Sequence, residues 1–137
     1  MEPARNVQEL IYRYRYLKDQ RDFFAEQLEL LNASLSNIIN TKNTLNNLKN
    51  TKVGEEILIP VGGLANIKAT IRDPEKIILN ISQDIAIQKN VDDSIEFLDK
   101  IIEQHNDQIN YLRNQIQSMD ANLQVMSKEF QKNMPNQ

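Results

Sequence analysis

The apolar residues of this chain follow two different periods. In residues 5–50 they recur seven apart, at Leu10, Leu17, Phe24, Leu31, Ile38 and Leu45. In residues 91–133 they alternate at spacings of four and three, whereas in residues 55–89 they occupy every second position. A heptad spacing is typical of coiled-coil helices, and a spacing of two is typical of strands with one buried face. The pattern therefore predicts two long helices joined by a β segment.

The β segment is predicted to contain four short strands, most simply arranged as two hairpins. The breaks between its apolar runs carry residues suited to turns, namely Gly62-Gly63, Asp73-Pro74 and Ser82-Gln83-Asp84. A four-stranded sheet with one apolar face must be covered, and long helices could touch it only at their ends. We therefore predict that another copy of the same sheet covers it, through an assembly interface. The predicted interface residues are Ile57, Ile59, Ile67, Ile71, Ile77, Leu79, Ile81, Ile85 and Ile87, and Ala69 shares their alternation.

The first helix is predicted over residues 5–50, with Gly54 marking its end. A second edge of its seam mixes apolar and cationic residues: Val7, Tyr14, Arg21, Leu28, Leu35, Lys42 and Lys49. Polar residues at such positions trade stability for register or for partner choice.

The second helix is predicted over residues 91–133, with Asn90 as its N-cap and Asp93 three residues later. Its seam comprises Val91, Ile95, Leu98, Ile102, His105, Ile109, Leu112, Ile116, Met119, Leu123, Met126 and Phe130. The polar His105 is either a residue that sets register or a pH-sensitive joint. Folded antiparallel and seam to seam, the helices would form one coiled-coil arm, with both chain ends at its tip, within a single unit of residues 1–137.

Composition excludes several classes of function. The formal net charge is −3 with 26% charged residues, so nucleic acid is not an expected partner. With no Cys and one His, we expect no disulfide, metal or other cofactor, and the glycines form no phosphate-binding motif. We therefore expect no enzyme activity. Neither a membrane-spanning run nor an N-terminal signal segment is visible, so a cytoplasmic location without membrane binding is expected.

Aromatic and basic residues alternate in Ile11-Tyr12-Arg13-Tyr14-Arg15-Tyr16. A strand or a surface that stacks single-stranded nucleic acid could show this pattern, but the uninterrupted heptads around it favour a helix. Two interpretations remain, solvated aromatics or an adhesive tip, since Tyr and Met suit adaptable contacts. The predicted tip residues are Ile11, Tyr12, Tyr14, Tyr16, Val125, Met126, Phe130 and Met134.

Three short stretches suggest a family. They are Glu56-Ile57-Leu58-Ile59-Pro60-Val61-Gly62, Ile67-Lys68-Ala69, and Ala86-Ile87-Gln88-Lys89-Asn90 before an acidic helix start. In these stretches, and in its order of helix, two hairpins and helix, the whole chain resembles the prefoldin family, most closely the α subunit of the archaeal form. It departs from the family's frequent glycine-containing turns at Leu64 and at Ser82-Gln83-Asp84.

The resemblance implies an α+β, prefoldin-like fold: a long antiparallel two-helix coiled coil joined by a four-stranded β segment. It also implies a hexamer of two α and four β subunits, with a β body and six arms. The arm tips would bind unfolded client proteins and deliver them to a group II chaperonin without ATP. The alternative function is a structural coiled-coil spacer or adaptor that binds no clients, although a spacer needs no central sheet.

Overall fold

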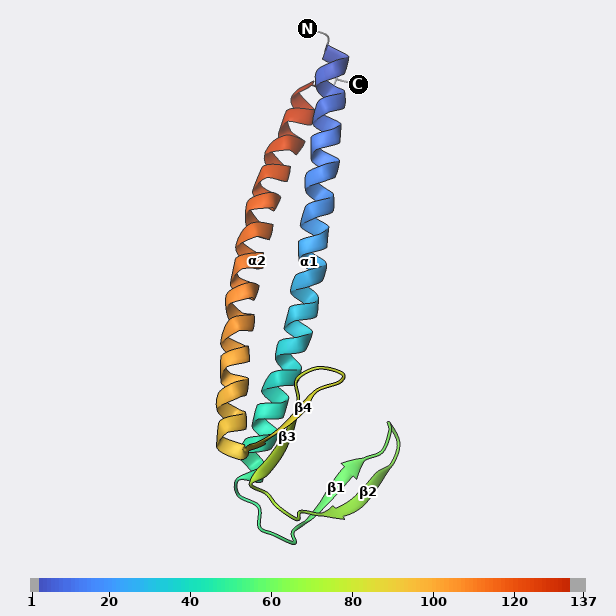
Figure 1. The fold of residues 1–137 in the computed structure, drawn as a ribbon. Coiled ribbons are helices and arrows are strands. Elements are labelled where there is room, and N and C mark those ends of the chain that lie inside the picture. The colour runs from blue at the N-terminus through green and yellow to red at the C-terminus, as the bar shows by residue number, and fades with distance from the viewer. Residues whose placement is uncertain (1–2, 134–137) are drawn as a thin grey trace. The chain divides into compact units, whose positions relative to one another are not determined.

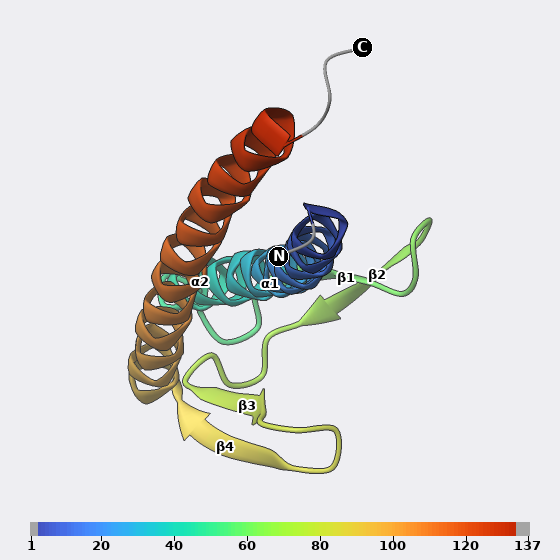
Figure 2. The ribbon, with the colours of Figure 1, turned by 90° about the horizontal axis from the view of Figure 1, so that it is seen from above.

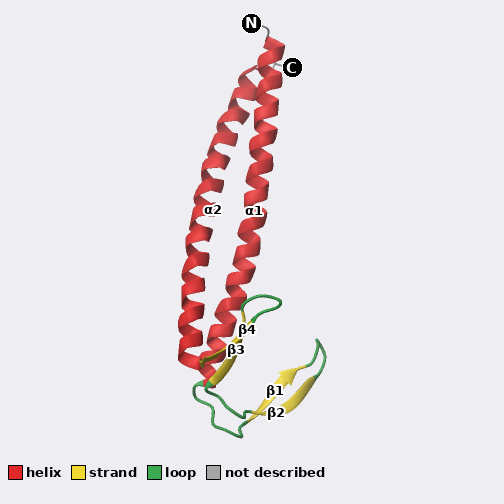
Figure 3. Ribbon diagram, viewed as in Figure 1, coloured by secondary structure: helices red, strands yellow, loops and turns green. Residues whose placement is uncertain are grey.

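The computed structural model describes residues 3–133, and its elements match the predicted order. Figure 1 shows the ribbon, and Figure 3 shows that helix and strand are the only regular elements of the described chain. The elements are α1 (Pro3–Leu48), β1 (Glu56–Pro60), β2 (Asn66–Thr70), β3 (Lys76–Asn80), β4 (Ala86–Asn90) and α2 (Val91–Asn133). The predicted α+β class, with two hairpins between two long helices, is confirmed.

The chain divides into two compact units. The terminal unit combines the described residues up to Ser34 with those from Gln104 onward, and the central unit is Leu35–Glu103. In the terminal unit, Tyr14 contacts Phe130 and Arg21 contacts Asp120, so the two helix segments run antiparallel.

Side-chain burial in the helices follows the predicted seams. Every predicted seam residue of α2, from Val91 to Phe130, is buried or half-buried. In α1 the same holds for both edges except Lys49, which is exposed. The predicted heptad phase is therefore confirmed in both helices.

The core of the central unit lies where the helices meet the second hairpin. It is built from Leu45 of α1 and Val91, Ile95 and Leu98 of α2. Ile77 of β3 packs against this cluster, together with Ile38, Leu48 and Phe97. Burying a side chain of this size contributes roughly 1.5 to 3 kcal/mol, so the cluster secures β3 to the helix ends.

The start of α2 carries the predicted cap. The Asp93 N–H donates to Asn90 Oδ1 at 2.7 Å, and Asn90 Nδ2 donates to Asp93 Oδ2 at 3.0 Å. The Val91 N–H, which has no acceptor within the helix, donates to the Glu75 carbonyl at 3.0 Å. The cap thus satisfies orphan donors of α2 and joins the helix to the chain just before β3.

The four strands form two separate antiparallel sheets of two strands each, β1 with β2 and β3 with β4. Figure 2 shows them as two distinct ribbons. The prediction of one four-stranded sheet is therefore wrong within the described chain. The apolar alternation on which it rested determines which face of a strand is apolar but not which strands pair. Between β2 and β3 the Glu75 N–H donates to Asp73 Oδ1 at 3.0 Å, a local turn that separates the hairpins.

Two glycines take the left-handed backbone conformation. Gly62, in the first hairpin turn, has a φ of 104°, a conformation that glycine adopts without strain. Gly54 has a φ of 87° but lies beyond the helix, because α1 ends at Leu48. The helix therefore ends at Leu48, two residues before the predicted end at residue 50, and Gly54 lies in the loop that follows it.

Candidate functional site

The first hairpin presents an apolar face that is only partly covered. Ile57 lies opposite Ala69, and Ile59 lies opposite Ile67, so the four side chains share one face. Ile57 and Ala69 are half-buried, whereas Ile59 and Ile67 are 40% and 51% exposed. Coverage therefore decreases toward the hairpin turn, where Leu64 is fully exposed.

The second hairpin shows the same gradient more strongly. Ile77 packs on the helix core, and Leu79, opposite Ile87, is buried. Beyond them the Ile81 N–H donates to the Ile85 carbonyl at 2.9 Å, and these two side chains are 48% and 56% exposed. The end of the hairpin near the helices is covered by this chain, and the end near the turn is not.

The nine predicted assembly residues therefore fall into three groups. Ile71 and Leu79 are buried, and Ile57, Ile77 and Ile87 are half-buried. Ile59, Ile67, Ile81 and Ile85 are exposed. Sequence reasoning missed further exposed apolar side chains in the same segment: Val53, Leu58, Val61, Leu64 and Ile78. The sequence could have revealed them, because large apolar residues that lie off the period-two face or in loops are not expected to be buried by this chain.

The predicted tip residues divide between the helix seam and solvent. Tyr14 and Phe130 meet edge to face, with ring centroids 5.9 Å apart and planes at 83°. Ile11 and the seam residue Met126 are half-buried. The contact between Tyr14 and Phe130 thus joins the two helices near the tip.

The other tip residues point outward. Tyr12, Tyr16 and Val125 are 73%, 59% and 57% exposed, and the Tyr16 hydroxyl accepts a hydrogen bond from Gln20 Nε2 at 3.1 Å. Met134 lies outside the described residues. The exposed apolar surface at the tip therefore consists of Tyr12, Tyr16 and Val125.

The cations on the second edge of the α1 seam reach across to aspartates of α2. In the terminal unit, Arg21 Nε lies 2.9 Å from Asp120 Oδ1, and this hydrogen bond and charge raise the pKa of Arg21 above its ordinary value. In the central unit, Lys42 and Lys49 lie 2.6 Å from Asp99 and Asp92, respectively. Such exposed pairs contribute little stability individually, but each one fits a single register.

His105 occupies the seam as predicted and is half-buried. Its Nε2 lies 3.0 Å from the Ser34 Oγ of the opposite helix, within the terminal unit. A polar layer therefore replaces an apolar one at this level of the seam.

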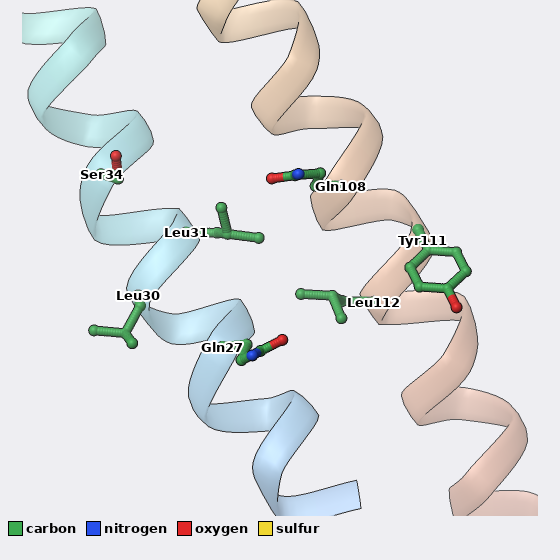
Figure 4. Close-up of a pocket in the computed structure, with 7 residues that line it drawn as sticks. All are labelled: Gln27, Leu30, Leu31, Ser34, Gln108, Tyr111 and Leu112. Carbon is green, nitrogen blue, oxygen red and sulfur yellow. The ribbon is translucent and has the colours of Figure 1, made fainter. Parts of the chain in front are cut away.

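A pocket of about 550 Å³ lies between the helices of the terminal unit (Figure 4). Its apolar lining is Leu30, Leu31, Tyr111 and Leu112, and its polar lining is Gln27, Ser34 and Gln108. Leu30 is 71% and Tyr111 is 59% exposed. Sequence reasoning missed this pocket, although Leu30 and Tyr111 are large apolar residues off the seam and could have signalled it.

Residues 3–133 hold no group of three or more His, Cys, Asp or Glu side chains arranged to bind a metal ion. Within the same residues, no helix has the length and apolar character that crossing a membrane requires.

Comparison with known proteins gives one consistent result. The family model for the prefoldin subunit matches residues 17–135. Prefoldin subunit alpha 1 of Thermococcus kodakarensis is 36% identical over 104 residues, which cover 76% of this chain and 71% of the relative. Prefoldin subunit alpha of Methanobrevibacter smithii is 31% identical over 127 residues, covering 93% and 82%. Among solved structures, a chain of filamentous PFD from Methanocaldococcus jannaschii has the same fold, with a TM-score of 0.72 at 19% identity, covering 85% of this chain and 96% of that one.

Proposed function

From the premise that this chain belongs to the prefoldin family, we propose that it is the α-type subunit of an ATP-independent chaperone that holds non-native polypeptides. The whole chain acts as one subunit in this proposal, in the cytoplasm and without catalysis. The complex delivers its clients to a group II chaperonin.

The observation that carries the proposal is the incomplete cover on both hairpins. Ile59, Ile67, Ile81 and Ile85 are apolar, face the same way as buried neighbours in their own hairpin, and remain 40% to 56% exposed. Such surface is normally covered by a partner chain. We propose that β-type subunits cover it in a hetero-hexamer of two α and four β chains.

The tip supplies the client contacts in this proposal. Tyr12, Tyr16 and Val125 are exposed on two adjacent helices that the Tyr14–Phe130 contact holds together. This surface is small, so each contact with a client is weak. Several arms around one client convert weak contacts into useful avidity through effective concentration.

The test removes residues 1–16 and 124–137, which include the whole predicted tip. The shortened α1 would still be about 45 to 50 Å long at 1.5 Å per residue and would keep its central core. We expect the truncated chain to assemble, as shown by sedimentation, but to lose the ability to suppress aggregation of a chemically unfolded protein diluted into buffer.

A point-variant version separates surface chemistry from helix length. Tyr12→Ser, Tyr16→Ser and Val125→Ser together should weaken suppression, whereas Arg13→Ser, Lys18→Ser and Gln124→Ser, which are also at exposed positions in or next to the tip, should not. Full protection by a correctly assembled truncated complex would show that clients are held elsewhere. Absence of any protection by the intact complex would favour the spacer or adaptor.

A further inference from the structure

We propose that the pocket between Leu31 and Leu112 is a second, separate binding site for extended non-native polypeptide, selective for an aliphatic side chain flanked by Lys or Arg. The inference rests on the proposed holding function but concerns a different part of the helices from the tip. It follows from the shape of the pocket, the chemistry of its lining and the charges around it.

The floor of the pocket suits an aliphatic side chain. Leu31 and Leu112 point toward each other between the helices, and Gln27 and Gln108 extend into the same space (Figure 4). The pocket is an open groove, and its volume of about 550 Å³ exceeds what one side chain fills. A side chain together with its adjoining backbone fits this space better than a side chain alone.

The polar lining suits peptide backbone. Gln27 and Gln108 each carry an amide that donates and accepts, and none of the side chains that line the pocket is ionised. Extended backbone presents the matching donors and acceptors, which need partners when they leave water. The exposed side chains of Tyr111 and Leu30 add apolar area that a bound peptide can contact.

The charges around the pocket select the flanking residues. Glu26 precedes Leu30 by one helical turn, and Asp107 precedes Tyr111 by one turn. Residues 22–41 of α1 contain no Lys or Arg. Arg113 is the single Lys or Arg among residues 101–127 of α2. The surroundings are thus acidic, which attracts a basic segment and disfavours an acidic one.

Three labelled peptides test the selectivity by fluorescence anisotropy on the full chain in its purified assembly. One has a central Leu flanked by Lys, the second replaces the Lys residues by Glu, and the third replaces the Leu by Ser. We expect the first to bind about tenfold or more tightly than either of the others. Equal affinity for the Lys-flanked and Glu-flanked peptides, or no saturable binding of the first, would overturn the proposal.

Disulfide trapping locates the peptide. The chain contains no Cys, so Gln108→Cys and Asn110→Cys each introduce a unique thiol at an exposed amide position of α2, and only position 108 lines the pocket. A Lys-flanked peptide with a Cys beside its Leu should form a mixed disulfide preferentially with the 108 variant. Equal trapping at both positions would contradict binding in the pocket.

The double variant Leu30→Ala with Tyr111→Ala should weaken binding of the first peptide about tenfold. Both side chains are exposed and alanine favours helix, so circular dichroism should show unchanged helicity. Ile39→Ala is the matched control, an exposed apolar residue of α1 outside both the pocket and the tip, and its loss should leave this affinity unchanged. An equal loss with Ile39→Ala would show that the affinity does not depend on the pocket and would overturn the proposal.

The outcomes separate this inference from the holding function itself. If the complex suppresses aggregation but the Lys-flanked peptide is neither bound selectively nor trapped preferentially at position 108, the pocket proposal fails and the holding function stands. If peptide binds at the pocket but the complex protects no client, the holding function fails and the site remains.

Discussion

The helix seams and the hairpin faces both consist of regularly spaced apolar residues. The chain buries those of the seams but leaves part of the hairpin faces exposed. Along α2 every predicted seam residue is covered to some degree by α1 or by the hairpin joined to it. On the hairpins, four of the nine predicted face residues remain exposed, namely Ile59, Ile67, Ile81 and Ile85.

The difference shows where the chain needs another molecule. A two-stranded hairpin is at best marginally stable alone, so each hairpin depends on what covers its apolar face. The helix core covers the β3 end of one hairpin through Ile77, whereas the apolar face residues near the turns stay 40% to 56% exposed. A coiled coil formed within one chain supplies its own partner, whereas these hairpins do not.

The largest expected effect is at Leu79, the most buried residue of the hairpin strands. Leu79→Asp places an unpaired charge in an apolar contact and should lower the free energy of unfolding by roughly 3 to 5 kcal/mol. Denaturant unfolding followed by circular dichroism measures this loss, and sedimentation should show that assembly fails with it. A loss below about 1 kcal/mol would mean that this position is open to water in solution.

Ile81→Asp sharpens the comparison, because Ile81 shares the face of Leu79 but is 48% exposed. We expect a change in unfolding free energy within about 0.5 kcal/mol, as for other surface substitutions, but a clear loss of hexamer. The control is Ile78→Asp, at an exposed position on the opposite face of the same hairpin. If both variants assemble equally well, the Ile81 face is not the interface.

A smaller effect is expected at the junction between hairpin and helix. Asn90→Ala removes the cap of α2 and should cost about 1 kcal/mol of stability. Asn110→Ala, in the interior of α2, makes the same chemical change without a cap and should be neutral or slightly stabilising. Thermal unfolding of the two variants side by side measures the contrast, and equal melting temperatures would show that the cap hydrogen bonds contribute nothing.

The smallest effect is expected at His105. His105→Leu replaces a polar seam residue with a better-packing one and should raise the melting temperature of the arm slightly. The gain is limited because the hydrogen bond to Ser34 is lost, although the serine hydroxyl can turn to a carbonyl of its own helix. Ser34→Ala, which breaks the same bond without adding packing, should lower the melting temperature. An unchanged melting temperature for His105→Leu would mean that an apolar residue at this seam position does not stabilise the arm.

Much of the fold was predictable because it depends on local periodicity and local chemistry. Heptad spacing located the seams, and the Asn90 cap was visible as Asn followed three residues later by Asp. The two hairpins followed from the turn residues between the strands, and the observed pairing of β1 with β2 and of β3 with β4 agrees with them. Whether the two hairpins join into one sheet was not predictable in the same way, because one face of Ile and Leu at alternate positions fits one sheet of four strands or two sheets of two equally well.

The candidate sites were predictable in part for the same reason. The pattern identified Tyr12 and Tyr16 as apolar residues off the seam, but it grouped them with Tyr14, which the structure places in contact with Phe130. The pocket was predictable only in part. Leu30 and Tyr111 were visible as large apolar residues off the seam, but the position of Leu31 opposite Leu112 depends on how the two helices pack.

The measurement that tests the central claim most directly is the mass of the purified chain, alone and after mixing with a β-type prefoldin subunit, by sedimentation or native mass spectrometry. Exposed hairpin faces predict that the chain alone self-associates or aggregates, and that the mixture forms a defined hexamer of two α and four β chains. A stable, well-dispersed monomer that stays monomeric in the mixture would contradict the account.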